Sequence, residues 1–169
     1  ICVLVGTMLF VALVINPIVT FICTRQNPYP LVLRCLKDSG ITAFFTRSSA
    51  ANIPVNMELC KDLGLDEDTY SISIPLGATI NMDGTSIMQG VAVVFVAQAF
   101  GIQLHMMDYI TVIGTATLAS IGTAGIPSVG LITLTMVFNS VGLPVEGIAL
   151  IMGIDRILDM TRTAVNITG

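Results

Sequence analysis

Charged side chains are scarce in this 169-residue chain, which also has no tryptophan and a single histidine. Asp, Glu, Lys and Arg together make up 11% of the residues, compared with about 25% in ordinary soluble domains. Hydrophobic residues make up 54%, and the mean hydropathy is +0.89. So few polar side chains cannot cover a soluble surface, and we therefore predict a protein embedded in a membrane.

The absence of clustered basic residues and of paired cysteines limits the possible functions. The basic residues are few and dispersed, which excludes a nucleic-acid partner, and the four cysteines show no paired spacing. An intramembrane aspartyl protease using Asp83 and Asp159 would need a Gly-x-Gly-Asp loop, which "GIDRILD" does not provide. We therefore expect a protein that is not an enzyme. The chain opens on "ICVLVGTMLF" and stops at "AVNITG", and we expect it to be part of a longer protein.

Segment lengths predict an all-α fold with two short hairpins. Residues 1–24 are long enough to span a hydrocarbon core of about 30 Å as one helix, with a kink expected at the Asn16-Pro17 pair. Residues 31–64 form two short arms around "TRSSAAN", and 109–143 form two uncharged arms around "SIGTAGIPSVG". Neither arm of a pair is long enough to cross, which favours re-entrant hairpins over pairs of spanning helices. A hairpin lying flat at the interface is the alternative for residues 31–64.

The distribution of positively charged residues supports this prediction of re-entrant hairpins. Arg25, Arg34, Lys37 and Lys61 lie in the segments that flank the first hairpin, whereas the loops 101–108 and 139–147 contain no Lys or Arg. The positive-inside rule then puts the opening of the first hairpin in the cytoplasm. The two hairpins would enter from opposite sides, as in an inverted repeat.

Residues 70–100 contain one charge, Asp83, inside the motif "NMDGT". As one helix they would extend about 45 Å, well beyond the hydrocarbon core, so we predict a spanning helix that is broken at this motif. An unwound turn there would direct the oxygens of Asn81 and Asp83 into the protein, where they suit Na⁺ or another hard cation. The alternative is that Asp83 only caps the second half of the helix.

The last segment, 147–169, has a polar face. On a helix, five of its side chains share an arc of about 100°, namely Asp155, Asp159, Arg162, Thr163 and Asn166. Four charges at about 3 kcal/mol each outweigh the gain of about 4 kcal/mol from its Leu, Ile and Val residues, so this helix cannot face lipid on all sides. Both charge signs together suit a zwitterion such as an amino acid. A purely structural ion-pair network is the alternative.

Four motifs carry a resemblance to a known family: "TRSSAANIPVN", "PLGATINMDGTSIMQGV", "LASIGTAGIPSVG" and "GIDRILDMTRTAVNITG". Together they resemble the dicarboxylate/amino acid:cation symporter family, the glutamate-transporter homologues, over essentially the whole chain. The resemblance implies an elevator-type transport domain in which two opposed re-entrant hairpins accompany the transmembrane helices. It also implies an N-terminal scaffold, absent from this chain, through which the full-length protein forms a homotrimer in the lipid of the cell membrane.

The resemblance implies roles for individual residues. Arg162 would hold the side-chain carboxylate of an acidic amino acid and Asp159 its amino group. The implied substrate-binding set is Arg162, Asp159, Asn166, Thr163, Thr85, Ser48, Ser49, Ala124, Gly125 and Ile126. The implied set for two or three Na⁺ ions is Gly77, Thr79, Asn81, Met82, Asp83, Ser120, Ile121, Thr123 and Asn166, with an Asp expected directly after Gly169. Gln89 stands where potassium-coupled members carry Glu, so potassium counter-transport is not expected.

The function expected from these residues is Na⁺-coupled symport of aspartate or glutamate by a multi-pass protein of the plasma or inner membrane. The first hairpin tip, "SSAAN", is closer to the serine/threonine-transporting branch, but that branch does not have the "NMDGT" and "DMTRTAVN" of this chain. The alternatives are Na⁺- or H⁺-coupled symport of serine and threonine or of dicarboxylates, with Asp83 or Asp155 titrating in a proton-coupled mechanism.

Overall fold

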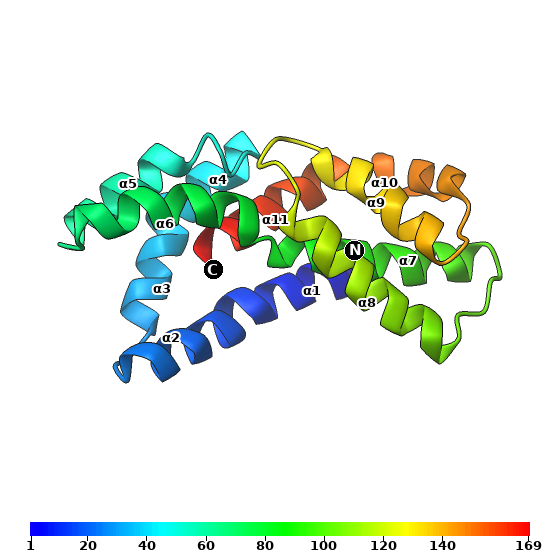
Figure 1. The fold of residues 1–169 in the computed structure, drawn as a ribbon, viewed down its shortest axis with the longest axis horizontal. Helices are drawn as coiled ribbons and strands as arrows, with labels where there is room; N and C mark the ends of the chain where they lie inside the picture. Colours follow the sequence, from blue (N-terminus) through cyan, green and yellow to red (C-terminus); the bar gives the residue numbers. More distant parts are fainter.

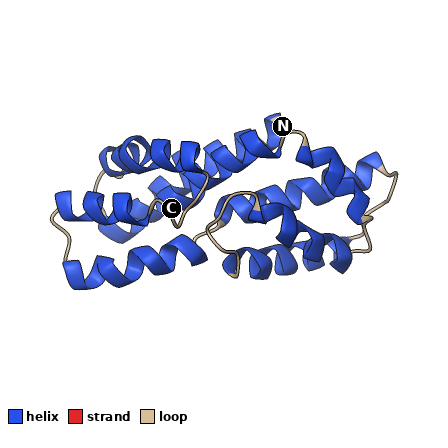
Figure 2. Ribbon diagram, turned by 90° about the horizontal axis from the view of Figure 1, so that it is seen from above, coloured by secondary structure: helices blue, strands red, loops and turns tan.

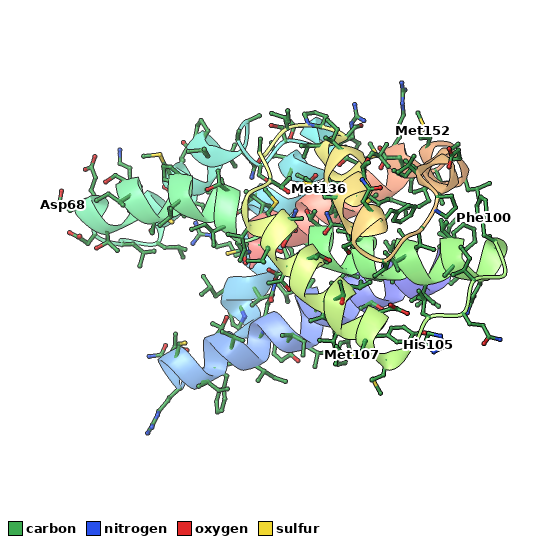
Figure 3. All side chains as sticks on the ribbon, turned by 45° about the vertical axis from the view of Figure 1, so that its right-hand side comes forward. Asp68, Phe100, His105, Met107, Met136 and Met152 are labelled. Carbon is green, nitrogen blue, oxygen red and sulfur yellow. The ribbon has the colours of Figure 1, made fainter.

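The computed structural model describes residues 1–169 and contains helices and loops but no β-strand, so the predicted all-α class is confirmed (Figure 1, Figure 2). Two of its helical stretches, Cys2–Thr24 and Glu67–Ala99, are long and apolar enough to cross a membrane. Many large apolar side chains point outward, among them Met107, Met136 and Met152 (Figure 3). This outer surface agrees with the membrane location that the composition predicts.

The first helix consists of α1 (Cys2–Phe10), a π-helical segment η1 (Val11–Ile15) and α2 (Asn16–Thr24), which follow one another over 23 residues. Pro17 has no N–H to donate to the preceding turn, and the wider π-type turn lies directly before the Asn16-Pro17 pair. The helix therefore changes its hydrogen-bond pattern where the kink was predicted, and it continues beyond that point. It ends at Arg25, which has a left-handed backbone with φ of 54°.

The first helical hairpin packs one arm against the C-terminal helix. Its elements are α3 (Tyr29–Cys35), the π-helical η2 (Leu36–Gly40), α4 (Ile41–Thr46) and the returning α5 (Ile53–Asp62). Ser39 and Asn52 are buried between the two arms, and the Asn52 amide donates to the Ser39 carbonyl oxygen at 3.3 Å. The turn between the arms includes Arg47, whose φ of 55° ends α4.

The long segment that follows is interrupted. Helix α6 (Glu67–Ile80) begins at Asp66, whose carboxylate accepts a hydrogen bond from the Thr69 N–H at 3.1 Å. Helix α7 (Asp83–Ala99) continues after two residues with non-helical backbone, Asn81 and Met82. The interruption therefore lies in the "NMDG" motif, where the length of the segment required one.

The second hairpin consists of α8 (Met106–Ile121) and α9 (Val129–Ser140). Asp108 accepts a hydrogen bond from the His105 N–H at 2.7 Å and so fixes the start of α8. The connecting stretch 122–128 is non-helical and holds the Gly- and Pro-containing tip. Ser128 precedes α9 with a φ of 59°.

The C-terminal segment departs from the sequence prediction of one helix over 147–169. It is divided into a 3₁₀ turn η3 (Val145–Ile148), α10 (Ala149–Met152) and α11 (Asp155–Thr168). The interruption is formed by Gly153 and Ile154, and glycine has a low helix propensity. Its effect is to place Asp155 in the first turn of α11, where the helix dipole favours a carboxylate.

The apolar core lies where α1, α7 and α9 meet α11, around Met8, Met88, Val93 and Phe138. The molecule is elongated, and its turns gather at two ends (Figure 1). Asp68 lies at one end, while Phe100 and His105 lie at the other (Figure 3). The two hairpins start from opposite ends and their tips meet near the middle, in front of α11 (Figure 1).

Candidate functional site

The polar side chains of α11 are turned into the protein. Asp155, Asp159, Arg162, Thr163 and Asn166 are each 5% exposed or less, whereas the intervening Arg156 is exposed. The helix packs against α4, α7 and α1. Periodicity predicted that these five residues share a face, and the packing of three helices keeps that face away from the surroundings.

An ion pair dominates this face. The Arg162 guanidinium donates to the Asp159 carboxylate through Nη2, one helical turn away. The other carboxylate oxygen of Asp159 accepts the Ser128 N–H at 3.0 Å and lies 3.8 Å from Nη1 of Arg47. Asp159 therefore links α11 to both hairpins. The Nε and Nη1 atoms of Arg162 are buried and have no hydrogen-bond partner.

Asn166 connects α11 to the interruption between α6 and α7. Its side-chain oxygen accepts the Gly84 N–H at 2.8 Å, and its Nδ2 donates to the Thr85 hydroxyl at 3.1 Å and lies 3.2 Å from the Met82 sulfur. A side chain at position 84 would come within 2.8 Å of the Arg162 carbonyl oxygen. The absence of a Cβ at Gly84 is therefore what allows the two helices to approach so closely.

The interruption offers oxygen ligands for a cation. Asn81 donates through Nδ2 to the Asn166 carbonyl at 2.8 Å, which leaves its Oδ1 free. The half-buried Asp83 carboxylate pairs with none of the arginines. A carboxylate, amide oxygens and the carbonyls of an unwound turn are the donors that a hard cation such as Na⁺ prefers, so the residues present fit this ion.

The two hairpin tips touch each other. The Ser48 hydroxyl donates to the Gly125 carbonyl at 2.7 Å, and the Ala50 N–H donates to the same oxygen at 3.1 Å. A small polar pocket lies beneath this contact. Its lining residues are Arg47, Ser49, Met82, Thr85, Thr123, Ala124, Gly125, Ile126, Val129, Arg162, Thr163 and Asn166.

Most of the substrate-binding set predicted from the sequence lines this pocket, and Asp159 and Ser48 contact residues of its wall. Ile126 contributes to the lining although about half of its side-chain surface is exposed. Of the predicted cation set, Met82, Thr123 and Asn166 also line the pocket, while Asn81 and Asp83 lie at the interruption.

The remaining predicted cation ligands lie outside the pocket lining. Ser120 is buried and accepts a hydrogen bond from Ser86 at 2.6 Å. Gly77 accepts the Asn81 N–H through its carbonyl at 2.8 Å. Thr79 and Ile121 have exposed side chains, and the resemblance implies their backbone groups as ligands.

Two residues of the site were not singled out from the sequence. Arg47 reaches Asp159 across the pocket, and its position at the end of the apolar arm, directly before Ser48, was a usable signal. Gly130 lies against the guanidinium of Arg162, since a Cβ at this position would overlap Nη1. No sequence pattern indicates this contact, because Gly130 and Arg162 are far apart in the chain and come together only through tertiary packing.

Comparison with known proteins assigns this chain to a family. The family model for the sodium:dicarboxylate symporter family matches residues 1–169. Three relatives named serine/threonine transporter SstT, from Streptococcus agalactiae serotypes Ia, V and III, are each 51% identical over 172 residues, which covers 98% of this chain. The chain spans 42% of the length of these relatives. The resemblance inferred from the motifs is thereby confirmed, and the chain belongs to the sodium:dicarboxylate symporter family.

Proposed function

We propose that the full-length protein is a Na⁺-coupled symporter of small neutral amino acids such as serine and threonine. This replaces the acidic amino acid favoured by the sequence analysis with the alternative named there. The names of the relatives favour serine and threonine. The observation in the chain that carries the proposal is the ion pair in which Asp159 already neutralises Arg162.

The charge balance of the site supports a ligand without net charge. The buried face of α11 carries Asp155, Asp159 and Arg162, and Arg47 of the first hairpin lies 3.8 Å from Asp159. Two positive and two negative charges balance, and a buried site tolerates an added net charge poorly. The carboxylate and ammonium groups of a zwitterion add no net charge, whereas aspartate or glutamate would add one negative charge.

Different residues of the chain bind different groups of the substrate. The Asp159 carboxylate accepts the substrate ammonium, and backbone N–H groups at the hairpin tips donate to the substrate carboxylate. The hydroxyls of Thr85 and Thr163 and the Asn166 amide are the polar groups available to a substrate hydroxyl. Asp83 and Asn81 hold Na⁺, whose charge favours the coupled binding of the substrate.

The hairpins act as gates in this proposal. The Ser48–Gly125 contact closes the pocket, and separation of the tips opens it from one side. The elongated domain carries the occupied pocket across the bilayer as an elevator against a trimeric scaffold, which is part of the longer protein. The full set of two or three Na⁺ ions belongs to that complete protein.

Acidic amino acid symport remains a second candidate because of one observation. Nε and Nη1 of Arg162 are buried donors without a partner, and a side-chain carboxylate that accepts from Nη1 would satisfy one of them. In that case the substrate would draw the guanidinium away from Asp159.

Uptake by the full-length protein in proteoliposomes separates the candidates. We expect uptake of labelled L-serine that requires an inward Na⁺ gradient and that L-threonine inhibits more strongly than L-aspartate. Stronger inhibition by aspartate would favour the acidic substrate. Uptake that follows a pH gradient and ignores Na⁺ would replace sodium coupling with proton coupling.

A further inference from the structure

Asn16 is an unexplained polar residue in the first helix. It is the only amide or charged side chain between Cys2 and Cys23, and such a group is expensive in an apolar helix unless it has a partner. Its Nδ2 atom is buried and makes no hydrogen bond. Its backbone is engaged, because its N–H donates to the Val11 carbonyl oxygen and its carbonyl accepts from the Thr20 hydroxyl at 2.8 Å.

The side chain of Asn16 reaches the cation ligands of the interruption. A Cβ placed on Gly169 would lie 3.2 Å from Asn16 Nδ2, 3.2 Å from Asp83 Oδ2 and 2.6 Å from Asn81 Nδ2. The three side chains come from α2, α7 and the linker before α7, and they meet around the last residue of the C-terminal segment. The contact between η1 and α11 brings the first helix to this point.

The backbone of the first helix is specialised at the same position. The π-type turn η1 (Val11–Ile15) ends directly before Asn16, and Pro17 follows. Turns of this type inside helices occur frequently at functional sites. The orientation of a side-chain amide is assigned from its hydrogen bonds, and Asn16 has none. Rotation of the amide by half a turn puts Oδ1 where Nδ2 stands, on the side of Asp83.

We propose that Asn16 is a ligand of the Na⁺ ion held by Asp83 and Asn81. This inference rests on the proposed sodium symport and adds a ligand from the first helix to that site. Asn16 supplies a neutral oxygen, so a single carboxylate balances the single charge of the ion, a set that suits Na⁺ better than a divalent cation. The bound ion then ties the first helix to α7 and to the end of α11.

Thermal unfolding of the full-length protein tests the inference without transport. Sodium chloride is titrated against choline chloride at constant ionic strength, without amino acid, and the unfolding temperature is followed. We expect Asn16→Ala to raise the Na⁺ concentration for half-maximal stabilisation about tenfold or more. The matched control is Thr7→Val, which removes an exposed hydroxyl from the same helix, one that bonds only the Val3 carbonyl. This control is expected to keep the wild-type value.

A second variant keeps the test informative if Asn16→Ala folds poorly. Asn16→Asp retains an oxygen at the site and adds a carboxylate, so we expect Na⁺ stabilisation to persist and stabilisation by Ca²⁺ to appear. If the unfolding temperature of Asn16→Ala depends on Na⁺ as in the wild type, or if Ca²⁺ does not stabilise Asn16→Asp, this inference is overturned. The proposed sodium coupling would then still stand. Absence of any Na⁺ effect in the wild type would overturn both this inference and the proposed sodium coupling.

Discussion

At the scale of single residues, the site depends on how the charge of Arg162 is held. Its guanidinium pairs with Asp159 and lies against the backbone of α9 at Gly130. A buried ion pair stabilises little in total, but loss of one partner leaves an uncompensated charge. The positions that confine the guanidinium are therefore as important as the pair itself.

Gly130→Ala should displace the guanidinium, because the new Cβ would occupy the position of Nη1. We expect a rise of about tenfold in the KM for substrate, with a loss of about 1–3 kcal/mol in stability from overpacking. Uptake kinetics in proteoliposomes and thermal unfolding measure the two effects. Gly114→Ala is the control, because its Cβ would meet nothing within 4 Å. A KM equal to that of the control would contradict this role.

Asn166→Ala should weaken the junction of α11 with α7. The change leaves the Gly84 N–H without an acceptor and removes the hydrogen bond to Thr85. A buried group left unpaired costs about 1–3 kcal/mol, and we expect a fall in unfolding temperature together with a loss of Na⁺ stabilisation. Asn139→Ala, on the exposed side of α9, should leave both unchanged. If the two variants had the same unfolding temperature and the same stabilisation by Na⁺, this role of Asn166 would be refuted.

At the scale of elements, the two hairpins act on each other through their tips. The Gly125 carbonyl accepts hydrogen bonds from both Ser48 and Ala50, and a Cβ at Gly125 would lie 3.0 Å from that of Ser49. Contact between non-helical tips satisfies backbone groups that would otherwise be unpaired away from water. In the proposed gating, opening of the pocket breaks this contact.

A disulfide between the tips tests this motion. In a variant without the four native cysteines, Ser49→Cys with Gly125→Cys should cross-link under mild oxidation after a small separation of the tips, because their Cβ atoms would lie 3.0 Å apart and a disulfide needs about 4 Å. We expect the cross-link to stop uptake and a reducing agent to restore it. The uptake of each single variant, whatever its level, should be the same before and after oxidation. Full uptake by the cross-linked protein would show that the tips need not separate.

At the scale of the whole molecule, the two ends differ in charge. Arg25 and Lys61 lie in or beside the turns at one end, and the loops 101–105 and 141–144 at the other end contain no Lys or Arg (Figure 1). From the positive-inside rule we predict that the first end faces the cytoplasm. The outward apolar side chains between the two ends suit lipid or the remainder of the longer protein.

Labelling of single cysteines tests this orientation in the full-length protein. Asp68 and Gln103 are both exposed. Asp68 lies at one end, and Gln103 belongs to the loop between Phe100 and His105, which lie at the other (Figure 3). We expect a membrane-impermeant maleimide to label Gln103→Cys in intact cells and Asp68→Cys only after permeabilisation. Both variants should react equally in detergent, which controls for accessibility. Labelling of Asp68→Cys from outside would reverse the predicted topology.

The sequence by itself determined the helical class, the interruption between Ile80 and Asp83 and the buried face of α11. These features follow from local quantities: hydrophobic periodicity, segment length against bilayer thickness, and the Asn and Gly residues that interrupt helices. The segment 147–169, predicted as a single helix, is instead interrupted at Gly153 and Ile154, which its hydrophobic periodicity does not indicate.

Only the tertiary structure decided which distant groups meet. Arg47 pairs with Asp159, Gly130 lies beside Arg162, and Asn16 and Asp83 both lie beside Gly169, through contacts between elements far apart in the chain. Local sequence carries no information on such distances, since they depend on how helices pack and on the close approach that glycine permits. The sequence therefore shows which functional group each residue carries, and only the tertiary structure shows which groups lie next to it.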